Sequence, residues 1–191
     1  MPRISESRIL IIATDGFEQH ELLGPRDLLL ERGAKVVLAS PKPEEIQGEV
    51  HSQPGKSIRP DTTVDQVSAD DFDALVLPGG VRNPDQLRMN EQVVNLIRDF
   101  ARQDKPIAAI CHAPWLLIEA GLVRDRRVTS WPSVRTDLRN AGGNVVDEPA
   151  VTDGKIVTSR NPNDVEAFTN ALVDLVEDAP AVTEIRDHVP A

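Results

Sequence analysis

The residue best placed to do chemistry in this chain is its single cysteine, Cys111. It follows an apolar run at 107–110 and precedes a segment with helical character that begins at Pro114. Residues 109–113 read Ala-Ile-Cys-His-Ala, and small residues around a nucleophile are typical of a nucleophile elbow, a sharp strand-to-helix turn. Because helix N–H groups at such a turn favour the thiolate, we expect the pKa of Cys111 to lie below the free-cysteine value of about 8.5. A lone cysteine is otherwise often a small buried hydrophobe, and the flanking pattern favours the reactive interpretation.

A Pro-Gly-Gly turn follows another apolar run, at 74–77. Such a sequence is most often only a turn, but glycine lets the backbone come close to a substrate. The N–H groups of Gly79 and Gly80, together with that of His112, could therefore form an oxyanion hole beside Cys111. We expect these two glycines to contribute to oxyanion or substrate binding.

Glu18 and Glu21 stand where the first apolar run, at 9–13, meets a helical stretch. Two interpretations are open: favourable charge in the first turn of a helix, or a carboxyl group close to Cys111. An ionised carboxylate would oppose the thiolate, whereas a protonated carboxyl would donate a hydrogen bond to it. Burial and the charge of the sulfur both raise the pKa of a carboxyl, so the protonated arrangement is physically consistent.

A thiol enzyme usually uses a base, and the chain has four histidines, His20, His51, His112 and His188. His112 adjoins the cysteine, but neighbouring residues of a helix do not face each other. A Cys-His pair therefore requires a distorted elbow or a turned imidazole. His20 lies at the same sheet edge and is interpreted as a solvated helix residue. Scattered histidines and one cysteine give no metal-ligand spacing, so we expect neither a metal nor another cofactor.

Short apolar runs alternate with longer amphipathic segments along the chain, as is typical of an α/β protein with a mainly parallel sheet covered on both faces. The predicted strands lie at 9–13, 36–39, 74–77, 107–110 and 156–158, and the predicted helices at about 18–32, 90–103, 114–121, 133–141 and 164–176. A hairpin is expected within 45–63, and Gly24-Pro25 should kink or restart the first helix. Because ligands bind beyond the carboxyl ends of parallel strands, the polar residues that follow three of these strands should meet at one edge, which we take as the site.

The bulk composition narrows the function classes. The 191 residues suit one domain, with a core at about 8–177 and a C-terminal tail at 178–191. A net charge of −10 argues against general nucleic-acid binding, and an aromatic content of 3% offers no base-stacking platform. No apolar run is long enough to span a bilayer, no export signal is recognised, and one cysteine excludes an intrachain disulfide. We therefore expect a cytoplasmic protein without a membrane partner.

Five segments together carry a resemblance to a known family. They are 17–22 (Phe-Glu-Gln-His-Glu-Leu), 77–80 (Leu-Pro-Gly-Gly), 109–114 (Ala-Ile-Cys-His-Ala-Pro), 128–132 (Val-Thr-Ser-Trp-Pro) and 158–164 (Thr-Ser-Arg-Asn-Pro-Asn-Asp). Over about residues 8–177 the chain resembles the PfpI-like intracellular protease and Parkinson-associated deglycase family, part of the class I glutamine amidotransferase-like superfamily. It lacks the downstream His-x-Glu pair of true glutamine amidotransferases, so ammonia production for a partner synthetase is not expected.

The resemblance implies a flavodoxin-like three-layer sandwich and a homo-oligomer, at least a dimer. It implies Cys111 as the nucleophile and as an oxidisable thiol, Glu21 as a protonated glutamate that touches it, and Glu18 as a second acidic residue nearby. His112 matches the histidine of the protease-like branch, which an acidic residue of a neighbouring subunit orients. The matching acid here is Asp85, one methylene shorter than the glutamate of some relatives; an exposed loop carboxylate is the alternative interpretation.

Two function classes fit these residues. In the first, Cys111 is the nucleophile of a stress-associated hydrolase, of deglycase, glyoxalase or peptidase type, that acts on small carbonyl adducts or peptides. In the second, the chain is a redox-sensing or protective stress protein in which Cys111 is oxidised and Glu21 stabilises the product. Both use the same thiolate. Ala113 replaces a glycine common after the Cys-His pair, and its methyl group is expected to narrow the oxyanion site.

Overall fold

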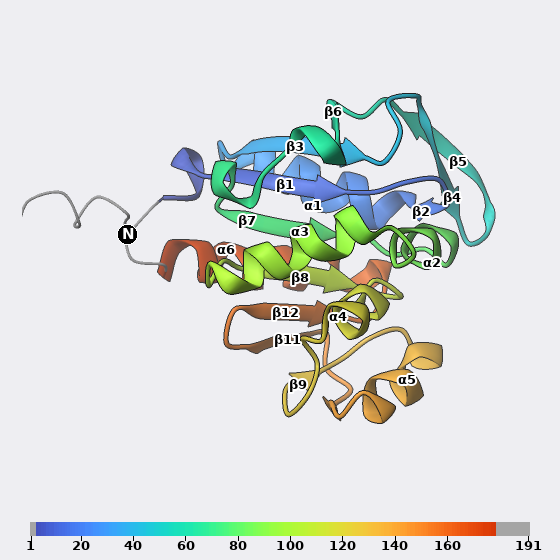
Figure 1. The fold of residues 1–191 in the computed structure, drawn as a ribbon, viewed down its shortest axis with the longest axis vertical. Helices are drawn as coiled ribbons and strands as arrows, with labels where there is room; N and C mark the ends of the chain where they lie inside the picture. Colours follow the sequence, from blue (N-terminus) through green and yellow to red (C-terminus); the bar gives the residue numbers. More distant parts are fainter. Residues whose placement is uncertain (1–2, 179–191) are drawn as a thin grey trace, which may run out of the picture.

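The computed structural model describes residues 3–178, which form a three-layer α/β sandwich (Figure 1). Its central sheet has seven strands in the order β11-β12-β8-β7-β1-β3-β6. They are β1 (Arg8–Ile12), β3 (Lys35–Ser40), β6 (Thr62–Thr63), β7 (Ala74–Leu77), β8 (Ile107–Ile110), β11 (Ala150–Asp153) and β12 (Ile156–Ser159). Neighbouring strands are parallel except β11 and β12, which pair antiparallel. The flavodoxin-like α/β fold predicted from the sequence is confirmed.

The central strands are apolar along their length because both of their faces are covered. Every residue of β7 and β8 is buried, and in β1 only the first residue is exposed. Successive side chains of a strand point to opposite faces of the sheet. Leu10 and Ile12 therefore belong to the hydrophobic cluster on one face, while Ile9 and Ile11 belong to the cluster on the other.

Helices cover both faces of this sheet (Figure 1). They are α1 (Gln19–Glu31), α2 (Arg82–Leu87), α3 (Glu91–Arg102), α4 (Pro114–Ala120), α5 (Arg135–Asn140) and α6 (Val165–Asp178), with short 3-10 helices at Ile4–Glu6, Val64–Gln66, Ala69–Asp71, Pro132–Val134 and Pro162–Asp164. Leu22 of α1 and Phe168 of α6 share one cluster, and Phe100 of α3 and Leu117 of α4 share the other. The sheet is therefore fixed from both sides, and its strand ends are rigid supports for a site.

Local signals explain where two helices begin and end. The Asn90 side chain accepts hydrogen bonds from the N–H groups of Gln92 and Val93, at 3.0 and 3.2 Å, and so caps α3. Gly121 follows α4 in the left-handed conformation, with a φ of +78°, which glycine adopts without steric cost.

The structure differs from two sequence expectations about helices. The first helix does not restart at Gly24-Pro25, because α1 runs without interruption through both residues. A proline removes one N–H donor, and Pro25 is itself buried in the packed face of the helix, which offsets that loss. Asp85 was expected in a loop but lies in α2. Pro84 belongs to the first turn of this helix, where an N–H has no intrahelical partner, so the proline does not prevent the helix.

A second sheet, of three strands, stands beyond the carboxyl ends of β1 and β7 (Figure 1). Its strands are β2 (Phe17–Glu18), β4 (Ile46–Val50) and β5 (Gln53–Ile58), and β4 and β5 form the hairpin predicted within 45–63. The sequence did not reveal β11 or the two-residue strands β9 (Arg127–Val128) and β10 (Asn144–Val145), because such short segments show no clear periodicity. Within residues 3–178, no helix is long and apolar enough to cross a membrane. The predicted tail lies almost wholly outside the described residues.

Candidate active site

Cys111 occupies a sharp turn between β8 and α4. Its φ is +66°, in the left-handed region that non-glycine residues rarely adopt, at a cost of about 1–2 kcal/mol. The turn is held on both sides, since the Cys111 N–H donates to the Ser159 carbonyl at 3.0 Å and its carbonyl accepts from the Trp131 N–H at 2.9 Å. A strained backbone that its neighbours enforce is a common feature of functional sites. The backbone geometry is that of the predicted elbow.

The His112 ring lies against the sulfur, with Nδ1 3.1 Å from Cys111 Sγ. Two neighbouring residues of a helix could not meet in this way; the left-handed cysteine permits it. The ring stacks on Trp131, with centroids 5.7 Å apart, and meets Trp115 edge-on at 5.3 Å. Nε2 is 3.4 Å from Ser133 Oγ. Burial lowers the pKa of His112, so the ring is predominantly neutral at pH 7.

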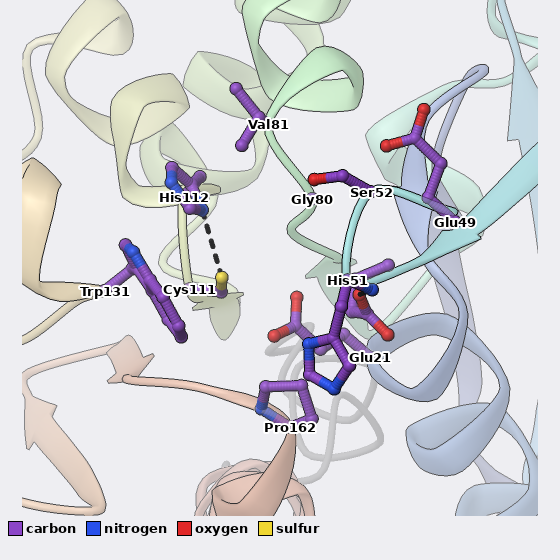
Figure 2. Close-up of a pocket in the computed structure, with 11 residues that line it drawn as sticks. Glu21, Glu49, His51, Ser52, Gly80, Val81, Cys111, His112, Trp131 and Pro162 are labelled. Atoms are coloured by element: carbon purple, nitrogen blue, oxygen red, sulfur yellow. Dashed lines mark hydrogen bonds between the residues drawn. The ribbon is translucent and has the colours of Figure 1, made fainter. Parts of the chain in front are cut away.

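Glu21 projects from the first turn of α1 and is fully buried. Its Oε2 accepts a hydrogen bond from the Gly79 N–H at 3.0 Å, while Oε1 has no hydrogen-bond partner among the described residues. Burial is the main cause that raises the pKa of Glu21 to about 8; the charge of Glu18 adds to the rise, and the Cys111 thiol opposes it. A protonated carboxyl would use its free oxygen as a donor, and Figure 2 shows the Glu21 carboxyl beside the sulfur.

The pKa of the Cys111 thiol is raised, which is the opposite of the direction expected from the sequence. Burial is the largest cause, and the charge of Glu21 and its contact with the thiol come next, whereas the N–H groups of Gly80 and His112 lower the pKa. The N–H groups at the turn therefore do not outweigh burial and the Glu21 carboxyl. Since repulsion by Glu21 disappears when that carboxyl holds a proton, the two groups titrate as a pair.

The two glycines after β7 have different roles from those expected. A side chain at Gly79 would meet Glu21 Oε2, Cys111 Cβ and the Ile110 carbonyl, so only glycine fits between the acid and the thiol. Because the Gly79 N–H is already bound to Glu21, it is not free for an oxyanion. The N–H of Gly80, like that of His112, acts on Cys111 instead. An oxyanion hole could therefore include Gly80 but not Gly79.

The sulfur opens into a cleft of about 190 Å³ (Figure 2). Its walls include four residues that the sequence analysis had singled out: Glu18, Glu21, Gly80 and His112. The cleft is also lined by residues that the sequence did not indicate for the site, namely Glu49, His51, Ser52, Val81, Trp131 and Pro162. Trp131 and Pro162 belong to segments that carried the family resemblance, but the hairpin residues gave no signal, because only tertiary folding brings the hairpin to the cleft.

Asp85 is exposed on α2 and does not line this cleft. Within one chain the structure therefore does not bring Asp85 to His112, whose second nitrogen faces Ser133 instead. His20 is also outside the cleft; its side chain is 56% exposed and its Nδ1 lies 3.1 Å from Glu18 Oε1. His188 lies outside the described residues. Across residues 3–178, no group of three or more His, Cys, Asp or Glu side chains could hold a metal ion.

Residues 7–175 match the model of the DJ-1/PfpI family. The chain belongs to this family. It is 40% identical over 170 residues to the deglycase PfpI of Pyrococcus furiosus, which covers 89% of this chain and 99% of that protein. It is 37% identical to general stress protein 18 of Bacillus subtilis, with coverage of 89% and 98%. The crystal structure of Drosophila melanogaster DJ-1beta superposes with a TM-score of 0.82 at 32% identity, covering 89% of this chain and 90% of that one.

Membership in the DJ-1/PfpI family supports a stress-associated hydrolase or deglycase at the level of the family, through the names that these relatives carry.

Proposed function

We propose that this DJ-1/PfpI protein is a cysteine-dependent hydrolase of the deglycase or glyoxalase type, which acts on small 2-oxoaldehydes and their adducts through Cys111. The observation that carries the proposal is the pairing of a strained elbow cysteine with a fully buried carboxyl whose pKa is raised to about 8. At neutral pH that carboxyl holds a proton, and the His112 ring lies 3.1 Å from the sulfur, so the site can supply a proton donor to a substrate oxygen and a base to the thiol.

The first step is addition of Cys111 Sγ to an aldehyde carbon. As the S–C bond forms, the thiol proton passes to His112 Nδ1, which lies 3.1 Å from Sγ. The carbonyl π pair moves to oxygen, and that oxygen takes the Glu21 proton, which gives a hemithioacetal, a His112 imidazolium and a Glu21 carboxylate. A proton then leaves the first carbon and another reaches the second carbon through an enediol, which yields a 2-hydroxyacyl thioester. Water cleaves the C–S bond to give a 2-hydroxy acid and the thiol, and transfer of the proton from His112 to Glu21 restores the site. The sum is one 2-oxoaldehyde and one water converted into one acid.

The size of the cleft favours small substrates over peptides. Its volume of about 190 Å³ is below the range of about 300–1,000 Å³ typical of drug-sized ligand sites. A three-carbon dicarbonyl fits such a space, whereas an extended peptide needs a longer groove. We therefore place deglycase or glyoxalase chemistry ahead of peptidase chemistry.

Turnover of methylglyoxal and of a peptide, by wild type and Cys111→Ser in a buffer without amines, tests the proposal. Wild type should form lactate, observed by proton NMR, and Cys111→Ser should not, while neither should cleave the peptide. Equal lactate formation by both proteins would contradict the proposal. If wild type forms no lactate and mild peroxide converts Cys111 to a sulfinic acid by mass spectrometry, the redox-sensing alternative takes its place.

A further inference from the structure

His51 is a second imidazole on the wall of the cleft that holds Cys111. It belongs to the turn that joins β4 to β5, 61 positions before His112 in the chain. In Figure 2 the two rings lie on opposite sides of the cleft, with the Glu21 carboxyl between them. His112 contacts the sulfur through Nδ1, whereas no such contact occupies the His51 ring among residues 3–178. The His51 side chain is therefore available to a bound molecule.

The turn that carries His51 has an unusual sequence for its geometry. His51 and Ser52 have φ values of +49° and +66°, and the flanking Val50 and Gln53 pair across the hairpin. Two-residue turns with both φ values positive favour Asn-Gly or Gly-Gly, because other residues are strained there. A histidine and a serine at these positions depart from the sequence preference of the turn. Such departures are concentrated at functional sites.

Two contacts hold this turn over the cleft. The His51 N–H donates to Glu18 Oε2 at 3.3 Å, and Glu18 is itself nearly buried beside α1. Glu49, at the fourth position of β4, forms an ion pair with Arg82 of α2 at 2.9 Å. The turn is therefore held by Glu18, next to α1, and by Arg82 of α2. These contacts outside the hairpin help to fix the position of the His51 backbone.

We propose that His51 is a further substrate-contacting residue of the Cys111 site, which hydrogen-bonds the second oxygen of a vicinal dicarbonyl while the sulfur attacks the first carbonyl carbon. This inference rests on the proposed function. A neutral imidazole can donate from one nitrogen and accept at the other, so it can bind a ketone oxygen or a hydroxyl. The site would then be selective for compounds with two adjacent oxygen-bearing carbons.

Replacement of His51 by asparagine tests the inference, because asparagine tolerates a positive φ and should keep the turn. His51→Asn should lower kcat/KM for methylglyoxal by about tenfold, the loss expected for one hydrogen bond to the reacting molecule. Alkylation of Cys111 by iodoacetamide should change by less than about twofold, since this reagent has no second carbonyl to bind. Lys56→Asn, which alters an exposed side chain of β5 outside the cleft, is the control and should behave as wild type. Wild-type kcat/KM in His51→Asn would overturn the inference.

A binding measurement separates this inference from the proposed function. Hydroxyacetone, an unreactive neutral analogue with two adjacent oxygens, is titrated into Cys111→Ser protein while the imidazole signals are followed by NMR. The His51 signal should shift saturably and the His20 signal should not. If wild type turns over no dicarbonyl but the His51 signal shifts, the proposed function fails and the contact stands. If the His51 signal does not shift, the contact is refuted whatever the turnover.

Discussion

The floor of the cleft, formed by Glu21, Gly79, Cys111 and His112, consists of buried residues, and the three with side chains are at most 8% exposed. The roof, formed by the hairpin turn at 49–53, has three consecutive exposed residues. Both regions contain non-glycine residues with positive φ. In the floor, strand ends and packed helices enforce that conformation; in the roof, a few polar contacts do. The reactive thiol thus lies where the structure is densely packed, and the proposed substrate contact lies on an exposed turn.

The largest effect should come from the nucleophile in the floor. Cys111→Ser should lower methylglyoxal turnover about a thousandfold or more, because serine is a far weaker nucleophile at neutral pH. Its free energy of unfolding should stay within about 1 kcal/mol of wild type, since the two side chains have the same shape. Paired activity assays and urea denaturation measure both. A large loss of stability would mean that Cys111 is chiefly a packing residue.

Gly79→Ala should damage the floor next most strongly. The added methyl group would collide with the Glu21 carboxyl and lie 2.7 Å from Cys111 Cβ. We expect a loss of about 1–3 kcal/mol of stability, together with a large fall in the rate of Cys111 alkylation. Gly121→Ala is the control for alkylation, because its φ of +78° strains alanine and lowers stability while the methyl group meets nothing within 4 Å. An unchanged alkylation rate in Gly79→Ala would show that the acid and the thiol do not need this close approach.

The buried carboxyl of the floor should make stability depend on pH. The pKa of Glu21 is raised to about 8 from 4.5, so the folded state binds its proton more tightly than the unfolded state. Its stabilising contribution is therefore complete below about pH 4.5 and is lost as the pH rises through about 8. Glu21→Gln should remove this dependence and be more stable than wild type at pH 8 by on the order of a few kcal/mol. Urea denaturation of both proteins at pH 5 and pH 8 measures this difference in the free energy of unfolding.

Other substitutions of Glu21 test whether its side chain donates a hydrogen bond to the Cys111 sulfur. Glu21→Gln should retain a reactive thiol better than Glu21→Asp, because the amide can still donate a hydrogen bond while the shorter acid cannot reach. Alkylation of Cys111 as a function of pH distinguishes the two variants. If both behave as wild type, Glu21 is not a partner of the thiol.

A second copy of the chain should contribute to the floor through Asp85. We expect a homo-oligomer in which Asp85 of one protomer approaches the His112 ring of another. Asp85→Ala should lower turnover about tenfold with little change in Cys111 alkylation, and dilution below the dissociation point should have the same selective effect. Asp85→Glu, which restores a longer acid, should retain activity. An active monomer in analytical ultracentrifugation would contradict this arrangement.

The smallest effect should come from the roof. Ser52→Gly places the preferred residue at the second position of the turn, so it should stabilise the protein by about 0.5 kcal/mol. Cys111 alkylation should be unchanged, because the floor does not depend on this strain. Thermal denaturation and iodoacetamide kinetics test the two parts. A marked change in the alkylation rate would show that the conformation of the roof affects the reactivity of Cys111, so the two regions would not be independent.

Much of the floor could be predicted because its residues lie next to strong local signals. Cys111 and Gly79 directly follow fully apolar runs, and parallel strands bring their carboxyl ends to one edge. The roof could not be predicted in this way. His51 lies in a polar hairpin whose sequence does not indicate where the hairpin folds back, and its contact with Glu18 joins residues 33 positions apart.

The sequence by itself determined the α/β fold, the elbow and the identity of the cysteine, because hydrophobic periodicity and small flanking residues are local properties. Only the tertiary structure decided the pKa values of Glu21 and Cys111 and the hydrogen-bond partner of the Gly79 N–H. Burial of Glu21 raises its pKa, the Gly79 N–H is committed to that carboxyl, and the direction of the Cys111 shift is reversed. These outcomes depend on which groups are removed from water together, and that follows from packing in three dimensions.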